Sequence, residues 1–72
     1  MDKENFLKLG SKIKYLRNRN KLSQFDISLK TGLTTRSISR IETGKIDPKY
    51  STLVKIAEAL NVEIKELVTF NF

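Results

Sequence analysis

Five polar side chains between residues 35 and 43 have the types and the spacing to bind a polyanion. Wound on an α-helix, they share one arc of its surface: Thr35, Arg36, Ser39, Arg40 and Thr43. An arginine can donate two hydrogen bonds to guanine O6 and N7, and serine or threonine hydroxyls bond bases or phosphates over a short reach. Because this arc carries two arginines and no acid, we interpret it as a nucleic-acid-binding face; the alternative is an ordinary solvated helix face.

The opposite arc of the same helix predicts how the helix is held. It consists of Thr34, Ile38, Ile41 and Glu42, with Ser37 at its margin. The isoleucines can enter a core, but Glu42 needs a partner, because an unpaired buried charge is costly. Arg17 projects from the apolar side of an earlier predicted helix and has the same need. We therefore predict a partly buried salt bridge between Arg17 and Glu42, with two separately solvated side chains as the alternative.

The segment 22–45 has the signals of two short helices joined by a turn. Ser23 is a preferred N-cap residue, and Asp26 three positions later completes a pattern like a capping box. The first helix runs to about Lys30 or Thr31, and Gly32 supplies the turn, where it is expected to adopt a positive φ. The second helix covers residues 35–43. Two short helices joined by a glycine turn, with a polar outer face on the second, are typical of a helix-turn-helix.

Apolar residues at helical spacing predict three more helices, so the fold class is all-α with five helices. Their approximate ranges are 5–20, 51–60 and 63–68. The three glycines and the single proline are interpreted as breaks between elements. The tail 68–72 alternates like a strand, and its aromatic residues Phe70 and Phe72 either fold back onto the core or cover a partner subunit. Residues 1–72 are expected to form one domain, because a chain of this length has no room for a second core.

The positive charge of the chain is concentrated in its first two thirds. The 72 residues include 14 Lys and Arg against 8 Asp and Glu, a formal net charge of +6. Through Lys49 there are 12 basic and 5 acidic residues, whereas from Tyr50 onward there are 2 basic and 3 acidic residues. This asymmetry favours one face for a polyanion and another face for a different role; a generally basic, solubilising surface is the alternative.

The composition excludes several classes of site. The chain has no Cys and no His, so it lacks disulfides, thiolate or imidazole zinc ligands and the usual pairs of catalytic base and nucleophile. No Gly-rich phosphate loop or carboxylate cluster indicates a nucleotide or a metal. We therefore expect no enzyme activity, cofactor, metal or small-molecule ligand. Without a run of roughly 20 apolar residues or a signal peptide, a cytoplasmic protein with no membrane partner is expected.

Spaced landmarks along most of the chain carry a family resemblance. They are Leu9-Gly10, Ile13, Leu16-Arg17, Leu22-Ser23-Gln24, Ile27, Gly32, Ile38, Ile41-Glu42, Gly44-Lys45, Pro48, Leu53, Ile56-Ala57 and Leu60. With these residues the chain resembles the lambda-repressor-like (Cro-like, xenobiotic-response-element type) helix-turn-helix family of bacterial and phage transcriptional regulators. The resemblance covers about residues 9–67 and implies the compact five-helix fold of that family.

The resemblance also implies a function and its residues. It implies a sequence-specific regulator, a repressor or controller protein, that binds a palindromic double-stranded DNA operator as a homodimer in the nucleoid. The tail 68–72 is a candidate dimer contact. The positions that match the family's base-contacting residues are Thr35, Arg36, Ser39 and Arg40. Those that match its phosphate-contacting residues are Gln24, Thr43 and Lys45. The family commonly pairs the residues at positions 17 and 42.

Two apolar residues that depart from the family pattern, Phe25 and Leu29, leave room for another function. Phe25 and Leu29 stand where the family usually has polar residues, so they either pack on the N-terminal extension or form an extra contact surface. In the second case the chain is a protein-interaction module of the same fold, such as an antitoxin or anti-regulator. Glu63 replaces the usual Ser or Asp cap of the last helix, so that helix is expected to fray.

Overall fold

The computed structural model describes residues 3–69, which form five α-helices and no strand. In chain order the helices are α1 (Lys3–Arg19), α2 (Gln24–Thr31), α3 (Thr35–Glu42), α4 (Tyr50–Leu60) and α5 (Ile64–Leu67). The predicted all-α, five-helix fold is therefore confirmed. No helix within residues 3–69 combines the length and the apolar character needed to cross a membrane.

The predicted boundaries differ from the observed ones at the two ends of the chain. Helix α1 already includes Lys3, because exposed lysine and glutamate are good helix formers that an apolar periodicity does not detect. Helix α5 is a single turn, and its N-cap Glu63 makes no side-chain capping bond. The strand predicted for the tail is wrong at Val68 and Thr69, where the Thr69 hydroxyl donates to the Lys65 carbonyl (2.7 Å) instead. Phe70 and Phe72 lie outside the described residues.

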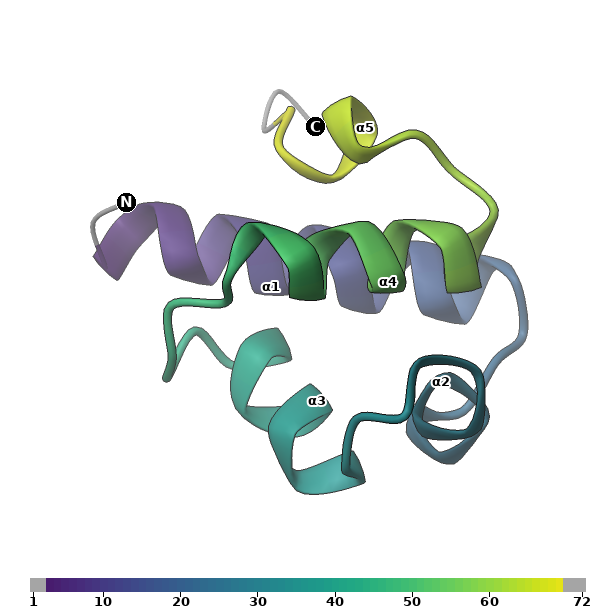
Figure 1. The fold of residues 1–72 in the computed structure, drawn as a ribbon. Helices are drawn as coiled ribbons and strands as arrows, with labels where there is room; N and C mark the ends of the chain where they lie inside the picture. The colour runs from purple at the N-terminus through teal and green to yellow at the C-terminus, as the bar shows by residue number, and fades with distance from the viewer. Residues whose placement is uncertain (1–2, 70–72) are drawn as a thin grey trace.

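One apolar core lies among the helices. Figure 1 shows α2 and α3 on one side of the molecule and α5 on the other, with α1 and α4 between them. Helix α3 packs against α1 and α2, α4 packs against α2 and α5, and α1 packs against α5. The buried apolar residues are Leu9, Ile13, Leu16, Ile27, Ile38, Ile41, Leu53, Ile56, Ala57, Leu60 and Leu67. Every helix contributes to this core, so the position of α3 depends on the rest of the fold.

Gly10 allows α1 to lie directly against the end of α3. A Cβ atom at this position would come within 2.4 Å of the Ile41 carbonyl oxygen and 2.5 Å of the Glu42 carbonyl oxygen. Both oxygens belong to the backbone, which cannot move aside as the end of a side chain can. Gly10 is therefore a packing residue in the middle of a helix, and its interpretation as a break between elements is wrong.

The substitution Gly10→Ala should lower the free energy of unfolding by about 1–3 kcal/mol, the usual cost of overpacking. The loss should appear although alanine is the better helix former by ~1 kcal/mol. Urea unfolding followed by circular dichroism measures it. Ser11→Ala is the matched control, because Ser11 is exposed on the same helix and should change stability by less than about 0.5 kcal/mol. A Gly10→Ala variant as stable as the control would contradict the close packing of α1 on α3.

Candidate nucleic-acid interface

Helix α3 presents its polar arc to solvent because its apolar arc is anchored in the core. Ile38 and Ile41 are 1% and 3% exposed. On the opposite arc Thr35, Arg36 and Arg40 are exposed and Ser39 is half-buried. The two arcs predicted from the sequence are thus the inner and outer faces of this helix, except that Thr34 of the inner arc is exposed at the N-cap. The outer face keeps both arginines accessible.

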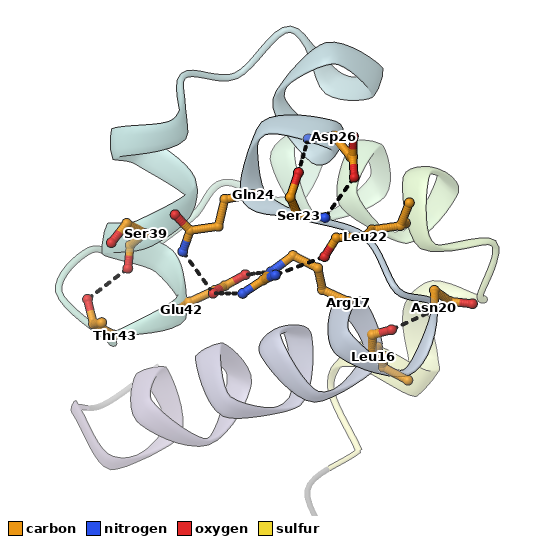
Figure 2. A network of polar contacts seen from close by, with 10 residues as sticks. All are labelled: Leu16, Arg17, Asn20, Leu22, Ser23, Gln24, Asp26, Ser39, Glu42 and Thr43. Atoms are coloured by element: carbon orange, nitrogen blue, oxygen red, sulfur yellow. Dashed lines mark hydrogen bonds and ion pairs between the residues drawn. The ribbon is translucent and has the colours of Figure 1, made fainter.

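Side-chain hydrogen bonds fix both ends of α3. At the start, the Thr34 hydroxyl oxygen accepts a bond from the Ser37 backbone N–H (3.0 Å), and no acid stands in the first turn. At the end, the Thr43 hydroxyl donates to the Ser39 carbonyl oxygen (2.8 Å; Figure 2). A phosphate oxygen can only accept hydrogen bonds, so a contact with the Thr43 hydroxyl requires that this internal bond be broken.

Arg17 and Glu42 form a buried ion pair that joins α1 to α3 (Figure 2). The guanidinium donates from Nε to Glu42 Oε2 (2.7 Å) and from Nη2 to Oε1 (3.1 Å). A third bond runs from Nη1 to the Leu22 carbonyl oxygen (2.9 Å), in the segment that leads into α2. The hydrogen bond with Glu42 raises the pKa of Arg17, and this effect outweighs the lowering by desolvation. Arg17 therefore stays charged and connects three elements.

Gln24 is tied to the same carboxylate, which sequence reasoning did not anticipate. Its side-chain amide donates to Glu42 Oε1 (3.1 Å; Figure 2). This bond uses one of the two amide hydrogens, so the second hydrogen and the amide oxygen remain available for other partners. Gln24 is the first residue of α2, and Glu42 is the last residue of α3. One acid thus sets the position of a predicted DNA-contacting side chain on a different helix.

The start of α2 is defined by a complete capping box. The Ser23 hydroxyl oxygen accepts from the Asp26 backbone N–H (2.9 Å), and Asp26 Oδ2 accepts from the Ser23 backbone N–H (2.8 Å). The bonds from Ser23 lower the pKa of Asp26 because they favour its charged form. At the other end Gly32 adopts φ 78°, the left-handed conformation expected at this turn. These caps fix the length of α2 and the direction in which the chain enters α3.

The seven predicted DNA-contacting residues lie at three places. Thr35, Arg36 and Ser39 lie along α3, where Thr35 and Arg36 are exposed and Ser39 is half-buried. Arg40, Thr43 and Lys45 lie together at one end of α3. There they line an open depression with four other residues, which we call the α1–α3 pocket: Lys3, Phe6, Leu7, Arg40, Thr43, Gly44 and Lys45. Gln24 lies at the start of α2, where its side-chain amide is bonded to Glu42 at the end of α3. Residues 3–69 contain no group of three or more acidic side chains able to hold a metal.

Residues 13–67 match the Helix-turn-helix family. The chain belongs to the Cro/C1-type branch of that family. Its members are DNA-binding transcriptional regulators and not enzymes. The family resemblance inferred from the sequence landmarks is thereby confirmed.

Similar proteins extend this assignment. An uncharacterised HTH-type transcriptional regulator of Methanocaldococcus jannaschii is 35% identical over 62 residues, which are 86% of this chain and 94% of that protein. An uncharacterised HTH-type transcriptional regulator of Sinorhizobium fredii is 40% identical over 56 residues, 78% of this chain. The match spans only 29% of that longer protein. The crystal structure of the restriction-modification controller protein C.AhdI from Aeromonas hydrophila has a TM-score of 0.87 at 28% identity, covering 89% of this chain and 97% of that one.

Removing one member of the buried ion pair should be far more damaging than removing both. Arg17→Met leaves the carboxylate of Glu42 buried without its main partner and should lower the free energy of unfolding by about 3–5 kcal/mol. The double variant Arg17→Met with Glu42→Leu should recover most of this loss, since two apolar side chains can pack where two charges were. Urea unfolding of both variants and wild type measures the effect. A double variant no more stable than Arg17→Met would show that the buried charge is not the cause of the loss.

The lowered pKa of Asp26 predicts how acid affects α2. A carboxylate whose folded-state pKa is depressed stabilises the fold above its unfolded pKa, and this contribution is lost as pH falls through the folded-state value. Asp26→Asn should therefore be less stable than wild type at pH 7, and the difference should vanish as pH falls below about 4. Urea unfolding at several pH values measures it. A difference that stays constant from pH 7 to pH 2.5 would show that the charge of Asp26 is unimportant.

Proposed function

We propose that this protein is a sequence-specific regulator of transcription, a repressor or controller, that binds a palindromic DNA operator as a homodimer. In this proposal residues 1–72 act as one DNA-binding domain, and α3 enters the major groove. Such a regulator works in the cytoplasm, where it meets its operator in the nucleoid. The C.AhdI similarity supports the controller role, because that protein is a restriction-modification controller.

The outer face of α3 carries this proposal. Its exposed arginines and hydroxyls are the groups that read base edges in the major groove, and the buried Ile38 and Ile41 hold that face outward. The absence of an acid in the first turn of α3 leaves the positive end of the helix dipole uncompensated, which favours a nearby phosphate.

The residue roles in this proposal are those that the family resemblance implies. The proposed base-contacting residues are Thr35, Arg36, Ser39 and Arg40, and the proposed phosphate-contacting residues are Gln24, Thr43 and Lys45. Phosphate contacts fix the register of the protein on the duplex and supply most of the affinity, whereas base contacts supply the choice of sequence. Arg17 and Glu42 take part indirectly, by holding α1, α2 and α3 in one arrangement.

A homodimer needs a surface outside the recognition helix. Tyr50 is 70% exposed and Val68 is 42% exposed, so apolar surface remains near the start of α4 and the end of α5. The aromatic residues Phe70 and Phe72, also proposed for this contact, lie outside the described residues. Two recognition helices about 34 Å apart would then meet successive major grooves on one side of the duplex.

Selection of bound sequences from a random duplex library, at two salt concentrations, tests this function. Enrichment of a palindrome whose half-sites are about one helical turn, ~34 Å, apart would support a dimeric operator-binding protein. Sedimentation of the protein with the enriched duplex then gives the number of subunits bound. Binding without enrichment that disappears as salt rises would leave only non-specific charge attraction, and the proposal would be wrong.

The substitution Arg40→Ala tests the base-reading role directly. Loss of a bidentate contact to guanine should weaken operator binding by about 1–3 kcal/mol and relax the sequence requirement at one base pair. Binding to a random duplex should weaken by less than binding to the operator. The control Arg19→Ala, which removes an exposed arginine of α1 that lies beside Tyr15 and Glu66, should affect both duplexes alike. Fluorescence anisotropy with both duplexes measures the two affinities. Equal losses on operator and random duplex would contradict a base contact by Arg40.

A protein-interaction module is the second candidate, and one observation favours it. Phe25 and Leu29 are one turn apart on α2, and they are 60% and 69% exposed. The expected packing of these side chains on the N-terminal extension is therefore absent within residues 3–69. If the library selection gives no enriched sequence, this apolar pair becomes the first surface to test, by asking whether Phe25→Ser with Leu29→Ser abolishes binding to a partner protein.

A further inference from the structure

The α1–α3 pocket gathers positive charge from two helices that are far apart in the sequence. Lys3 comes from the first turn of α1, Arg40 from the last turn of α3, and Lys45 from the segment that follows α3. None of the seven lining residues is acidic. Within residues 3–69 no ion pair involves any of these three cations. The pocket therefore has the composition of an anion-binding site.

Close packing holds α1, the helix that begins with Lys3, against the end of α3. A Cβ atom on Gly44 would lie 2.7 Å from Leu7 Cδ2 and 3.0 Å from Leu7 Cα, so the chain leaving α3 touches α1 one turn after Lys3. Figure 1 shows this teal-green loop passing beside the purple start of α1. Together with the contact of Gly10 on Ile41 and Glu42, it sets α1 against the end of α3 at two points. Lys3 lies on the same helix, one turn before the first of these contacts.

The occupant of the pocket can be inferred from its charge and its neighbours. Like charges that converge on one depression repel one another, and a bound anion relieves that repulsion. Arg40 and Lys45 also belong to the proposed DNA interface, so the pocket is continuous with it. A duplex whose major groove holds α3 has its backbone phosphates at the edges of that groove, beside the ends of the helix. A DNA phosphate is therefore the anion that the pocket is placed to meet.

We propose that Lys3, together with Lys45 and the charge of Arg40, binds a DNA backbone phosphate in the α1–α3 pocket. The first turn of α1 then becomes part of the DNA interface. This inference rests on the proposed function and deepens it, because it adds a phosphate contact outside the helix-turn-helix. Lys3 contributes to affinity and to register, and not to the choice of bases.

The substitution Lys3→Gln tests the proposal, with Lys8→Gln as the matched control. Lys8 is an exposed lysine on the same helix. It forms an ion pair with Glu4 (Nζ to Oε1, 3.5 Å) and does not line the pocket. Both variants remove one positive charge, so any general effect of net charge is the same in both. Anisotropy titrations between 50 and 200 mM salt, with the selected operator and with a random duplex, give the salt dependence of each affinity.

The proposal predicts a specific difference between the two variants. In Lys3→Gln the slope of log affinity against log salt should fall by about 0.9, the value for one lost phosphate contact. Its affinity deficit relative to wild type should shrink about three-fold between 50 and 200 mM salt. The operator and the random duplex should be affected alike. Lys8→Gln should keep the wild-type slope, and Lys3→Arg should restore it.

Neutral methylphosphonate linkages placed one at a time in the operator locate the contact. One linkage should weaken the binding of wild type more than that of Lys3→Gln, because the variant has already lost one of the three positive charges that meet that phosphate. If Lys3→Gln has the same slope as Lys8→Gln, or if no single linkage behaves in this way, the phosphate contact by Lys3 is wrong while operator binding stands. If wild type enriches no sequence and binds no duplex, the proposed function itself fails, and the contact fails with it. Circular dichroism of both variants checks that each remains folded.

Discussion

The carboxylate of Glu42 is the constraint on which the geometry of this molecule depends. It accepts hydrogen bonds from Arg17 of α1 and from Gln24 of α2, while belonging itself to the last turn of α3. Apolar contacts tolerate sliding because they have no direction, whereas a bidentate bond between a guanidinium and a carboxylate allows one arrangement. A buried pair of this kind adds little net stability. The effect of the bonds to Glu42 is instead to hold α2 and α3, the two helices of the helix-turn-helix, in a single relative orientation.

That constraint matters because α3 is not a stable element by itself. Eight residues are too few for an independent helix in water, and a chain of 72 residues has a small core to hold it. Helix α3 is therefore maintained by Ile38 and Ile41, by its Thr34 cap and by the close approach of Gly10. Each of these acts on the inner face or at the ends of α3. The residues of its outer face can therefore vary with what they bind, without loss of the contacts that hold the helix.

The sequence could predict two kinds of feature. One kind depends on the periodicity of a single helix, and the other depends on the cost of burying a charge without a partner. The two arcs of α3 follow from helical periodicity, and the need of Arg17 and Glu42 for partners follows from their places on apolar faces. The bond from Gln24 to Glu42 could not be foreseen, because it depends on how α2 and α3 cross. Gly10 was misinterpreted for a similar reason, since its role exists only once α3 lies against it. The expected strand is wrong at Val68 and Thr69 because alternation over so few residues is a weak pattern.

The hydrogen bonds of the free protein also separate the proposed DNA-contacting side chains into two kinds: those that already have a partner in the described part of the chain and those that do not. The Thr43 hydroxyl already donates to the Ser39 carbonyl, so a phosphate contact there exchanges one bond for another and gains little. One amide hydrogen of Gln24 is likewise committed to Glu42. Lys45 and Arg40, in contrast, make no ion pair within residues 3–69. In the proposed complex, affinity is therefore expected to come mainly from these exposed cations and to depend strongly on salt, while the committed side chains would supply fixed geometry against which the duplex is aligned.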